Sequence, residues 1–293
     1  MIDQLIAWIA VALRLLESNI GWMAWNLFLA LLPLGISFWL FHRPRSRFLR
    51  WGVGFLLGLT FFCGVQRYNF ANLINLIRSL GTTFLDLDTI YLIGAIALTL
   101  LLMGLDIWLL RGRGSRSLGW WAGFLVFITF LPNAPYVLTD IIHLIDDIRR
   151  NYSAWIITLA IIPQYLLFMV LGFEAYVLSL IYLGDYLREQ GWRKFILWVE
   201  LTIHGLSAIG IYLGRFQRFN SWHIITQPDV LFSSLINDLV AKFPVVVMAV
   251  TFVVITVLYW IMKQLSLGIM LRTQRRIASE EETSNPDTST AGF

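Results

Sequence analysis

Long apolar stretches constrain the fold of this chain more than any other feature of its sequence. The longest runs from Ala154 to Gly184 and, at about 1.5 Å of helix rise per residue, would extend ~46 Å. Inside a bilayer the backbone N–H and C=O groups must pair with one another, and a helix pairs them within one segment. Hydrophobic residues make up 58% of the chain and charged residues 14%, whereas soluble domains carry about 25% charged residues. The sequence therefore predicts an all-α integral membrane protein.

Seven stretches are predicted to cross the bilayer as transmembrane helices. Most of them approach or exceed the ~20 apolar residues that a spanning helix needs. Together they form a predicted transmembrane domain at 19–266, with spans at 20–41, 51–66, 89–110, 118–135, 154–184, 195–213 and 244–262.

Three further segments are not predicted to span. Residues 1–18 place apolar side chains at helical spacing, but the apolar run between Gln4 and Arg14 is far too short to cross. We therefore predict an interfacial helix there. A second amphipathic stretch within 67–88 predicts another surface helix, and the polar segment 267–293 predicts a disordered tail.

The distribution of basic residues predicts an orientation. Most of the 22 Lys and Arg residues lie in the connections after the first, third and fifth spans and after the seventh span. Cytoplasmic loops carry an excess of these residues, so the N-terminus is predicted outside and the C-terminus inside. The net charge of +4 comes from these loops and does not indicate nucleic-acid binding. The single cysteine, Cys63, excludes an intrachain disulfide and a cysteine-based zinc site.

Two prolines interrupt the fourth predicted span. Pro132 and Pro135 lack a backbone N–H and disturb the carbonyl four residues earlier, so we expect the helix to stop there. Carbonyls freed in this way need a new partner inside a membrane. The amide of Asn133, or a pairing of Asn133 with Asn26, is the predicted replacement.

Polar residues that follow the prolines predict a site at the outer face. Thr139 or Asp140 is predicted to cap a short helix that carries His143. The predicted topology brings a second polar motif to the same side, where two arginines suit a phosphate or carboxylate, or pair with acidic residues of this chain. The predicted ligand-binding residues are Asn133, Asp140, His143, Arg215, Arg218, Asn220 and Trp222.

A second polar group is predicted inside the membrane. Glu200 and His204 lie one turn apart on the sixth span, and Glu174 lies at similar depth on the fifth. We expect all three to face the interior, with a glutamate hydrogen-bonded to His204. Three interpretations remain open: the groups hold helices together, they relay a proton or bind a substrate, or they join Asp140 and His143 as ligands of a divalent metal.

Three motifs resemble those of a known family. They are Trp25-Asn-Leu-Phe-Leu-Ala30 with Pro33; Leu131-Pro-Asn-Ala-Pro-Tyr136 with Thr139, Asp140, His143 and Leu144; and Gly214-Arg-Phe-Gln-Arg218 with Asn220, Ser221 and Trp222. The chain is similar over most of residues 20–265 to bacterial multi-pass membrane proteins known as a domain of unknown function. An acidic residue commonly follows Asn-Ser-Trp in that family, whereas this chain has His223. The resemblance implies a bacterial cell membrane and no particular reaction.

The sequence leaves three functions open. The first is binding of a lipid headgroup or a small polar ligand at the outer membrane face. The second is a metal-dependent membrane enzyme that uses buried Glu, His and Asp residues. The third is a non-catalytic assembly or scaffold subunit of a membrane complex.

Overall fold

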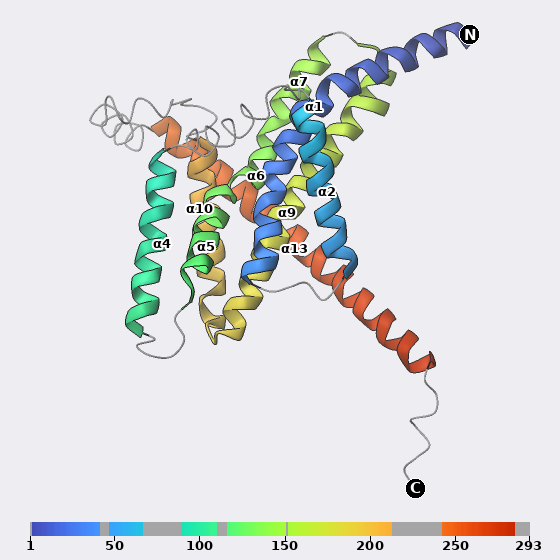
Figure 1. Ribbon diagram of the computed structural model, residues 1–293. Coiled ribbons are helices and arrows are strands. Elements are labelled where there is room, and N and C mark those ends of the chain that lie inside the picture. The colour runs from blue at the N-terminus through green and yellow to red at the C-terminus, as the bar shows by residue number, and fades with distance from the viewer. Residues whose placement is uncertain are drawn as a thin grey trace.

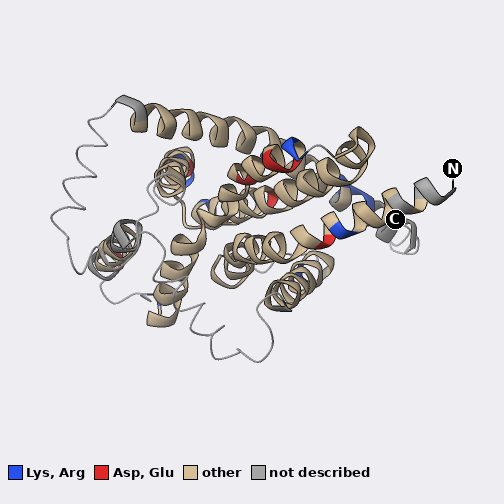
Figure 2. Cartoon of the chain, turned by 90° about the horizontal axis from the view of Figure 1, so that it is seen from above, with Lys and Arg blue, Asp and Glu red and all other residues tan. Residues whose placement is uncertain are grey.

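Helices make up the regular structure of this chain. The computed structural model describes residues 2–41, 47–66, 89–109, 116–150, 152–212 and 242–284 (Figure 1). Within these residues the structure contains helices and no strand. Six of the helices are long and apolar enough to cross a membrane, and a shorter apolar helix covers Gly94–Asp106. The chain is therefore a multi-pass membrane protein, and its charged residues are sparse along the ribbons (Figure 2).

Helix α1 (Ile2–Leu40) is one unbroken helix of 39 residues. No break precedes the first span, so the segment predicted as an interfacial helix at 1–18 is continuous with that span. The polar residues at the predicted boundary are used within the fold: Ser18 donates to the carbonyl of Leu15 at 2.7 Å, and Asn19 bonds to other helices. At about 1.5 Å per residue this helix extends ~58 Å.

The next two helices flank the bundle. Helix α2 (Arg47–Gln66) packs along α1, and a Cβ at Gly64 would lie 3.2 Å from the Cα of Trp25, so the two backbones approach closely. Helix α4 (Thr89–Leu109) stands at one side of the molecule next to α5 (Figure 1). The second surface helix predicted within 67–88 lies outside the described residues.

The proline pair does not stop the chain's helical course. Helix α5 (Leu118–Phe130) is followed by α6 (Asn133–Tyr136), the 3-10 turn η2 (Val137–Asp140) and α7 (Ile141–Arg149). Backbone torsions at the junction stay right-handed, at φ −56° and ψ −39° for residue 131 and φ −66° and ψ −19° for residue 132. The fourth span therefore continues to the end of α7 instead of ending at 135.

New hydrogen bonds explain why the helical course survives. The N–H of Ala134 donates to the carbonyl of Leu131 at 3.2 Å, and the N–H of Tyr136 donates to the carbonyl of Pro132 at 3.1 Å. The side-chain amide of Asn133 donates to the carbonyl of Phe130 at 3.2 Å. Asn133 therefore serves a carbonyl beside the prolines, but not that of Ile128 or Leu131, which lie four residues before each proline.

The fifth span contains a change of helix type before its proline. Helix α8 (Ala154–Ile156) passes into the π-helical turn η3 (Ile157–Ile161) and then into α9 (Ile162–Glu189), with Pro163 in the first turn of α9. π-Helix is rare and occurs mostly as single turns inside α-helices, where the regular hydrogen-bond ladder is interrupted. The regular α-helical pattern is therefore interrupted just before Pro163.

A glycine ends α9 and lets the chain reverse. Gly191 has a positive φ of 79°. Its N–H donates to the carbonyl of Arg188 at 3.1 Å, and the N–H of Trp192 donates to the carbonyl of Leu187 at 2.8 Å. This pair of bonds is the Schellman motif, in which glycine adopts the left-handed conformation without strain. The 3-10 turn η4 (Arg193–Phe195) then leads into α10 (Ile196–Tyr212), close to the predicted sixth span.

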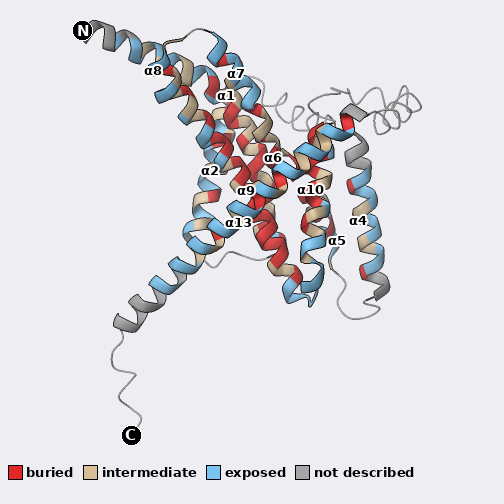
Figure 3. Ribbon diagram, turned by 180° about the vertical axis from the view of Figure 1, so that it is seen from behind, coloured by how far each residue is buried: buried red, intermediate tan, exposed pale blue. Residues whose placement is uncertain are grey.

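The last helix is much longer than predicted. Helix α13 (Lys242–Ser284) has 43 residues, whereas the sequence predicted a span at 244–262 and a polar tail from 267. It crosses α10 and α9 obliquely, and its C-terminal part leaves the bundle (Figure 3). Residues 285–293 lie outside the described part of the chain.

The two ends of the bundle differ in the segments they hold. The helix ends at 40 and 47, 109 and 118, and 189 and 196 lie at one end, toward which α13 also runs, whereas α7 and the N-terminus lie at the other (Figure 1). The predicted alternation of the chain agrees with this arrangement. The side that each end faces remains a prediction.

Candidate functional site

A buried carboxylate and an exposed imidazole lie together at the α7 end of the bundle. Asp140 is 1% exposed, and the amide of Asn26 donates to its Oδ2 at 3.1 Å. Nε2 of His143 lies 3.9 Å from Asp140 Oδ1, and half of the His143 side chain is exposed. The Trp22 ring lies 5.0 Å from the imidazole ring. This arrangement presents His143 at the surface between a carboxylate and an indole.

The predicted helix cap is wrong. Asp140 makes no side-chain capping bond to α7, and the hydroxyl of Thr139 donates back to the carbonyl of Tyr136 at 2.7 Å. Both residues already have helical backbone torsions, because η2 runs directly into α7. Neither residue therefore starts a new helix.

The predicted outer site is brought together only in part. The structure places Asp140 next to His143, while the amide of Asn133 serves the backbone carbonyl of Phe130 and Asn26 bonds to Asp140. The other predicted members, Arg215, Arg218, Asn220 and Trp222, lie outside the described residues.

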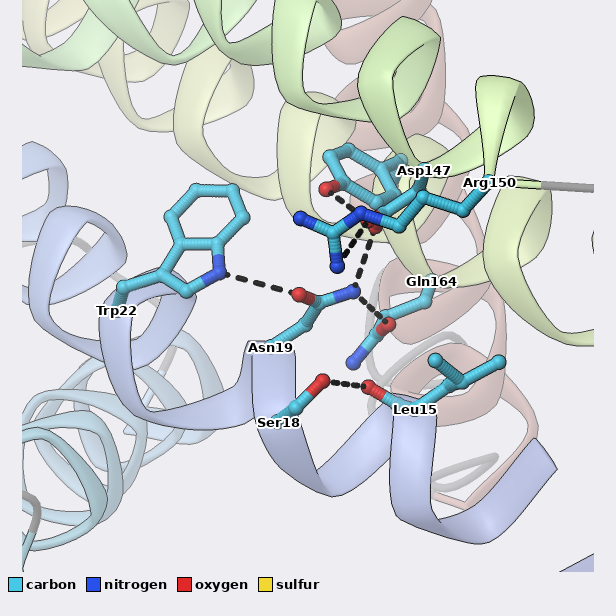
Figure 4. Close-up of polar contacts among 8 residues, drawn as sticks. Leu15, Ser18, Asn19, Trp22, Asp147, Arg150 and Gln164 are labelled. Atoms are coloured by element: carbon cyan, nitrogen blue, oxygen red, sulfur yellow. Dashed lines mark hydrogen bonds and ion pairs between the residues drawn. The ribbon is translucent and has the colours of Figure 1, made fainter. Parts of the chain in front are cut away.

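A second carboxylate network, not predicted from the sequence, joins three helices at the same end (Figure 4). Oδ2 of Asp147 accepts from the amide of Asn19 at 3.1 Å and from the hydroxyl of Tyr165 at 3.0 Å. Its Oδ1 lies 3.6 Å from Nη1 of Arg150. The three partners come from α1, α9 and the end of α7, so Asp147 ties these helices together.

Trp22 and Gln164 extend this network. The indole N–H of Trp22 donates to Oδ1 of Asn19 at 3.2 Å, so the indole that packs on His143 is held by the second network. The amide of Gln164 donates to the carbonyl of Leu16 at 3.0 Å, and its Oε1 lies 3.5 Å from the Asn19 amide. Asn19 and Gln164 interrupt apolar stretches, which was the signal available in the sequence.

Inside the bundle, Glu200 pairs with Lys263, which directly follows the predicted seventh span. Nζ of Lys263 lies 2.5 Å from Oε1 of Glu200, and the hydroxyl of Tyr259 donates to the same oxygen at 2.8 Å. Glu200 is buried as predicted. An ion pair therefore joins α10 to α13 within the apolar part of both helices.

His204 is buried, but its partner is not a glutamate. The Tyr176 hydroxyl lies 2.7 Å from Nδ1 of His204 and 3.5 Å from Oγ of Ser207. The ring of Tyr259 packs on the imidazole with the centroids 4.6 Å apart. The predicted interior position of His204 is confirmed, whereas the predicted hydrogen bond between His204 and a glutamate is wrong.

Glu174 has only part of its hydrogen-bonding capacity satisfied. The hydroxyl of Ser266 donates to Oε1 of Glu174 at 2.5 Å, which joins α9 to α13. The other carboxylate oxygen, Oε2, is buried and has no hydrogen-bond partner among the described residues. Glu174 itself is partly buried.

The predicted set of metal ligands is not assembled. Among the described residues, no group of three or more His, Cys, Asp or Glu side chains could hold a metal ion. Asp140 and His143 lie at the α7 end, while Glu200, His204 and Glu174 each bond to a different partner. These five residues therefore do not form the shared metal site considered from the sequence.

Comparison with known proteins identifies a family without an assigned activity. The family model described as "Protein of unknown function (DUF1361)" matches residues 94–257, which is more than half of the chain. The chain belongs to this family. No curated protein and no solved structure matched the chain. The DUF1361 match includes Asp140, Asp147 and Glu174, while their partners Asn26, Asn19 and Ser266 lie outside it.

Proposed function

We propose that this protein binds an anionic lipid headgroup, or a small anion of the same chemistry, at the α7 end of the bundle. The observation that carries the proposal is the exposed imidazole of His143, which lies beside the buried Asp140 and the Trp22 ring. An imidazole presents a ring N–H that can donate to a headgroup oxygen. Asp140 and Trp22 hold the imidazole at one place on the surface.

Arg150 adds a cationic group to the same end. Its side chain is 64% exposed, and it is anchored through Asp147. A guanidinium offers several N–H donors in a plane, which suits phosphate oxygens. In this proposal, the connection between α10 and α13 adds further donors to the headgroup site, from Arg215, Arg218, Asn220 and Trp222. Asn133 supports the backbone at the proline junction.

The surface of α7 supports a lipid as the source of the anion. Its exposed side chains include polar groups and four isoleucines. The exposed isoleucines are Ile141, Ile142, Ile145 and Ile148. A helix with charged and apolar faces fits the boundary between headgroups and acyl chains. We therefore propose that the isoleucines contact acyl chains while His143 and Arg150 bind the headgroup.

Native mass spectrometry of the full chain tests this proposal. The detergent-solubilised protein is mixed with equal amounts of phosphatidylglycerol and phosphatidylcholine, and the retained lipid is counted. We expect preferential retention of phosphatidylglycerol, reduced at least threefold by His143→Gln combined with Arg150→Gln. Added inorganic phosphate that displaces the lipid would show that the site also accepts a free anion.

A matched control exists at the opposite end of the bundle. Arg188 pairs with Asp185 three residues earlier and is 60% exposed, much as Arg150 pairs with Asp147. Arg188→Gln should leave lipid retention unchanged. Equal retention of both lipids by the unaltered protein contradicts headgroup binding, and a stoichiometric protein partner in the same spectra would favour the scaffold alternative instead.

A further inference from the structure

We propose that Glu174 and Ser266 form a site for a small monovalent cation, either a proton or a sodium ion, inside the membrane-spanning part of the bundle. This site is separate from the proposed headgroup site and does not depend on it. The two residues come from α9 and α13, and Ser266 donates to Oε1 of Glu174 at 2.5 Å. Oε2 of the same carboxyl is buried and has no partner among the described residues.

The position of Glu174 makes an unpaired charge there unfavourable. It lies twelve residues from the start and fifteen from the end of α9 (Ile162–Glu189), which places it roughly 18 and 22 Å from those ends. Ionisable groups at such depth are costly and almost always pair or mark an ion or proton pathway. A cation bound at Oε2 would neutralise the carboxylate and satisfy the oxygen that the protein leaves open.

Glu200 is a carboxylate of the same bundle whose charge is compensated by a cationic side chain. It has a lysine at 2.5 Å and a tyrosine hydroxyl at 2.8 Å, both on α13. Glu174 meets α13 about one turn further along, at Ser266, and receives only a neutral hydroxyl there. No ion pair involves Glu174 within the described part of the chain. Within the described residues, α13 therefore supplies a cation to Glu200 on α10 and none to Glu174 on α9.

The donor atoms define the class of cation. Two carboxylate oxygens and a hydroxyl oxygen are hard donors, which suit protons and alkali or alkaline-earth cations better than soft metals. A single carboxylate provides one negative charge, so a monovalent cation gives a neutral site. Because Oε2 is already buried, a bulky organic cation is excluded from the site.

Labelling with dicyclohexylcarbodiimide tests this site on the full chain in membranes. The reagent enters apolar regions and adds to a protonated carboxyl: the proton moves to a carbodiimide nitrogen while the carboxyl oxygen bonds to the central carbon. Rearrangement gives a stable N-acylurea that retains the whole reagent. Peptide mass spectrometry then measures the labelled fraction of Glu174 and of Glu200. We expect Glu174 to label at least tenfold faster than Glu200, because the ion pair with Lys263 keeps Glu200 ionised.

Two conditions distinguish the two cations. Replacing choline chloride with sodium chloride at constant ionic strength should slow the labelling of Glu174 if the site binds sodium. Labelling that slows as the pH rises, with no effect of sodium, identifies a proton site. Glu174 labelling that is no faster than that of Glu200, or that depends on neither sodium nor pH, overturns the proposal.

Two variants test the contribution of the hydroxyl. Ser266→Ala should weaken the effect of sodium, or shift the pH dependence, by at least threefold. Thr273→Ala is the control, because the Thr273 hydroxyl is on the same helix but donates to its own backbone at Ile269. If sodium and pH affect Glu174 labelling equally in the two variants, Ser266 does not contribute to the site. Glu174→Gln must abolish labelling at this position, which confirms the modified residue.

Discussion

At the residue scale, the buried charges of this protein depend on partners from distant parts of the chain. Lys263 and Glu200 are joined by a contact of 2.5 Å, although 63 residues separate them. The Glu200 side chain is 10% exposed and that of Lys263 is 24% exposed. Removing one member of a buried pair leaves the other charge without compensation, which is far more harmful than removing both.

We therefore expect Lys263→Met to lower the free energy of unfolding by about 3 kcal/mol. Lys263→Met combined with Glu200→Gln should recover most of this loss. Denaturation of the detergent-solubilised protein, followed by tryptophan fluorescence, measures both changes. Arg188→Met is the surface control and should change the stability by less than ~1 kcal/mol, because its partner Asp185 is exposed. A double variant that is less stable than Lys263→Met would contradict this account.

Asn133 allows a structural role to be separated from a ligand-binding role. Its amide donates to the carbonyl of Phe130 at the proline junction. Asn133→Leu should cost about 1–2 kcal/mol of stability, because a polar group in the membrane loses a partner. Retention of phosphatidylglycerol by the folded fraction should not change. A loss of lipid retention with unchanged stability would show that Asn133 contacts the ligand.

Single residues also show where sequence reasoning reaches its limit. Glu200 and His204 were placed in the interior because an ionisable group facing lipid is costly, and the structure agrees. Their partners could not be derived, because spacing along one helix does not show which face of another helix lies opposite. The role of Lys263 could not be derived for the same reason: only the crossing of α13 over α10 shows its partner.

At the element scale, each predicted span coincides with helical segments over most of its length, while the ends of the helices differ from the predictions. Hydropathy locates the apolar part of a helix, and the helix can continue through polar residues that bond to neighbours. Asn19 in α1 behaves in this way, as does Ser266 in α13. The proline pair was read as a stop because local rules ignore donors such as the Asn133 side chain.

The turn between α9 and α10 gives a prediction at this scale. Gly191 has φ 79°, a conformation that costs other residues about 1–2 kcal/mol. Gly191→Ala should therefore lower the melting temperature in detergent. Gly205→Ala is the control: Gly205 lies within α10, and an added Cβ would meet nothing within 4 Å. This control should be neutral or stabilising, since alanine favours helices over glycine. The opposite order of the two melting temperatures would contradict the assigned turn.

The helix-joining network around Asp147 gives a second prediction. Asn19→Leu removes the amide that donates to Asp147 and accepts from the indole of Trp22. We expect a loss of about 2 kcal/mol in stability, because a buried carboxylate loses one of its donors. Hydrogen exchange should increase at the α7 end more than around Gly191. A uniform increase over all helices would show that Asn19 does not act locally.

At the scale of the whole molecule, the arrangement of charge and helix ends defines an orientation. The basic connections follow α1, α4 and α9. The helix ends on either side of them lie at the same end of the bundle as the C-terminal part of α13, opposite α7 (Figure 1). If the positive-inside rule applies, that end faces the cytoplasm and α7 faces outside. The headgroup proposal requires the outer leaflet for His143, so it depends on this orientation.

Cysteine labelling measures this orientation directly, because Cys63 is the only native cysteine. Asp146→Cys and Arg275→Cys, each in a Cys63→Ser chain, place one exposed thiol on α7 and one on the C-terminal part of α13. In right-side-out membrane vesicles, we expect a membrane-impermeant maleimide to label the α7 thiol at once and the α13 thiol only after detergent is added. Labelling of both thiols before detergent, or of the α13 thiol alone, would contradict the predicted orientation and the outer-leaflet site.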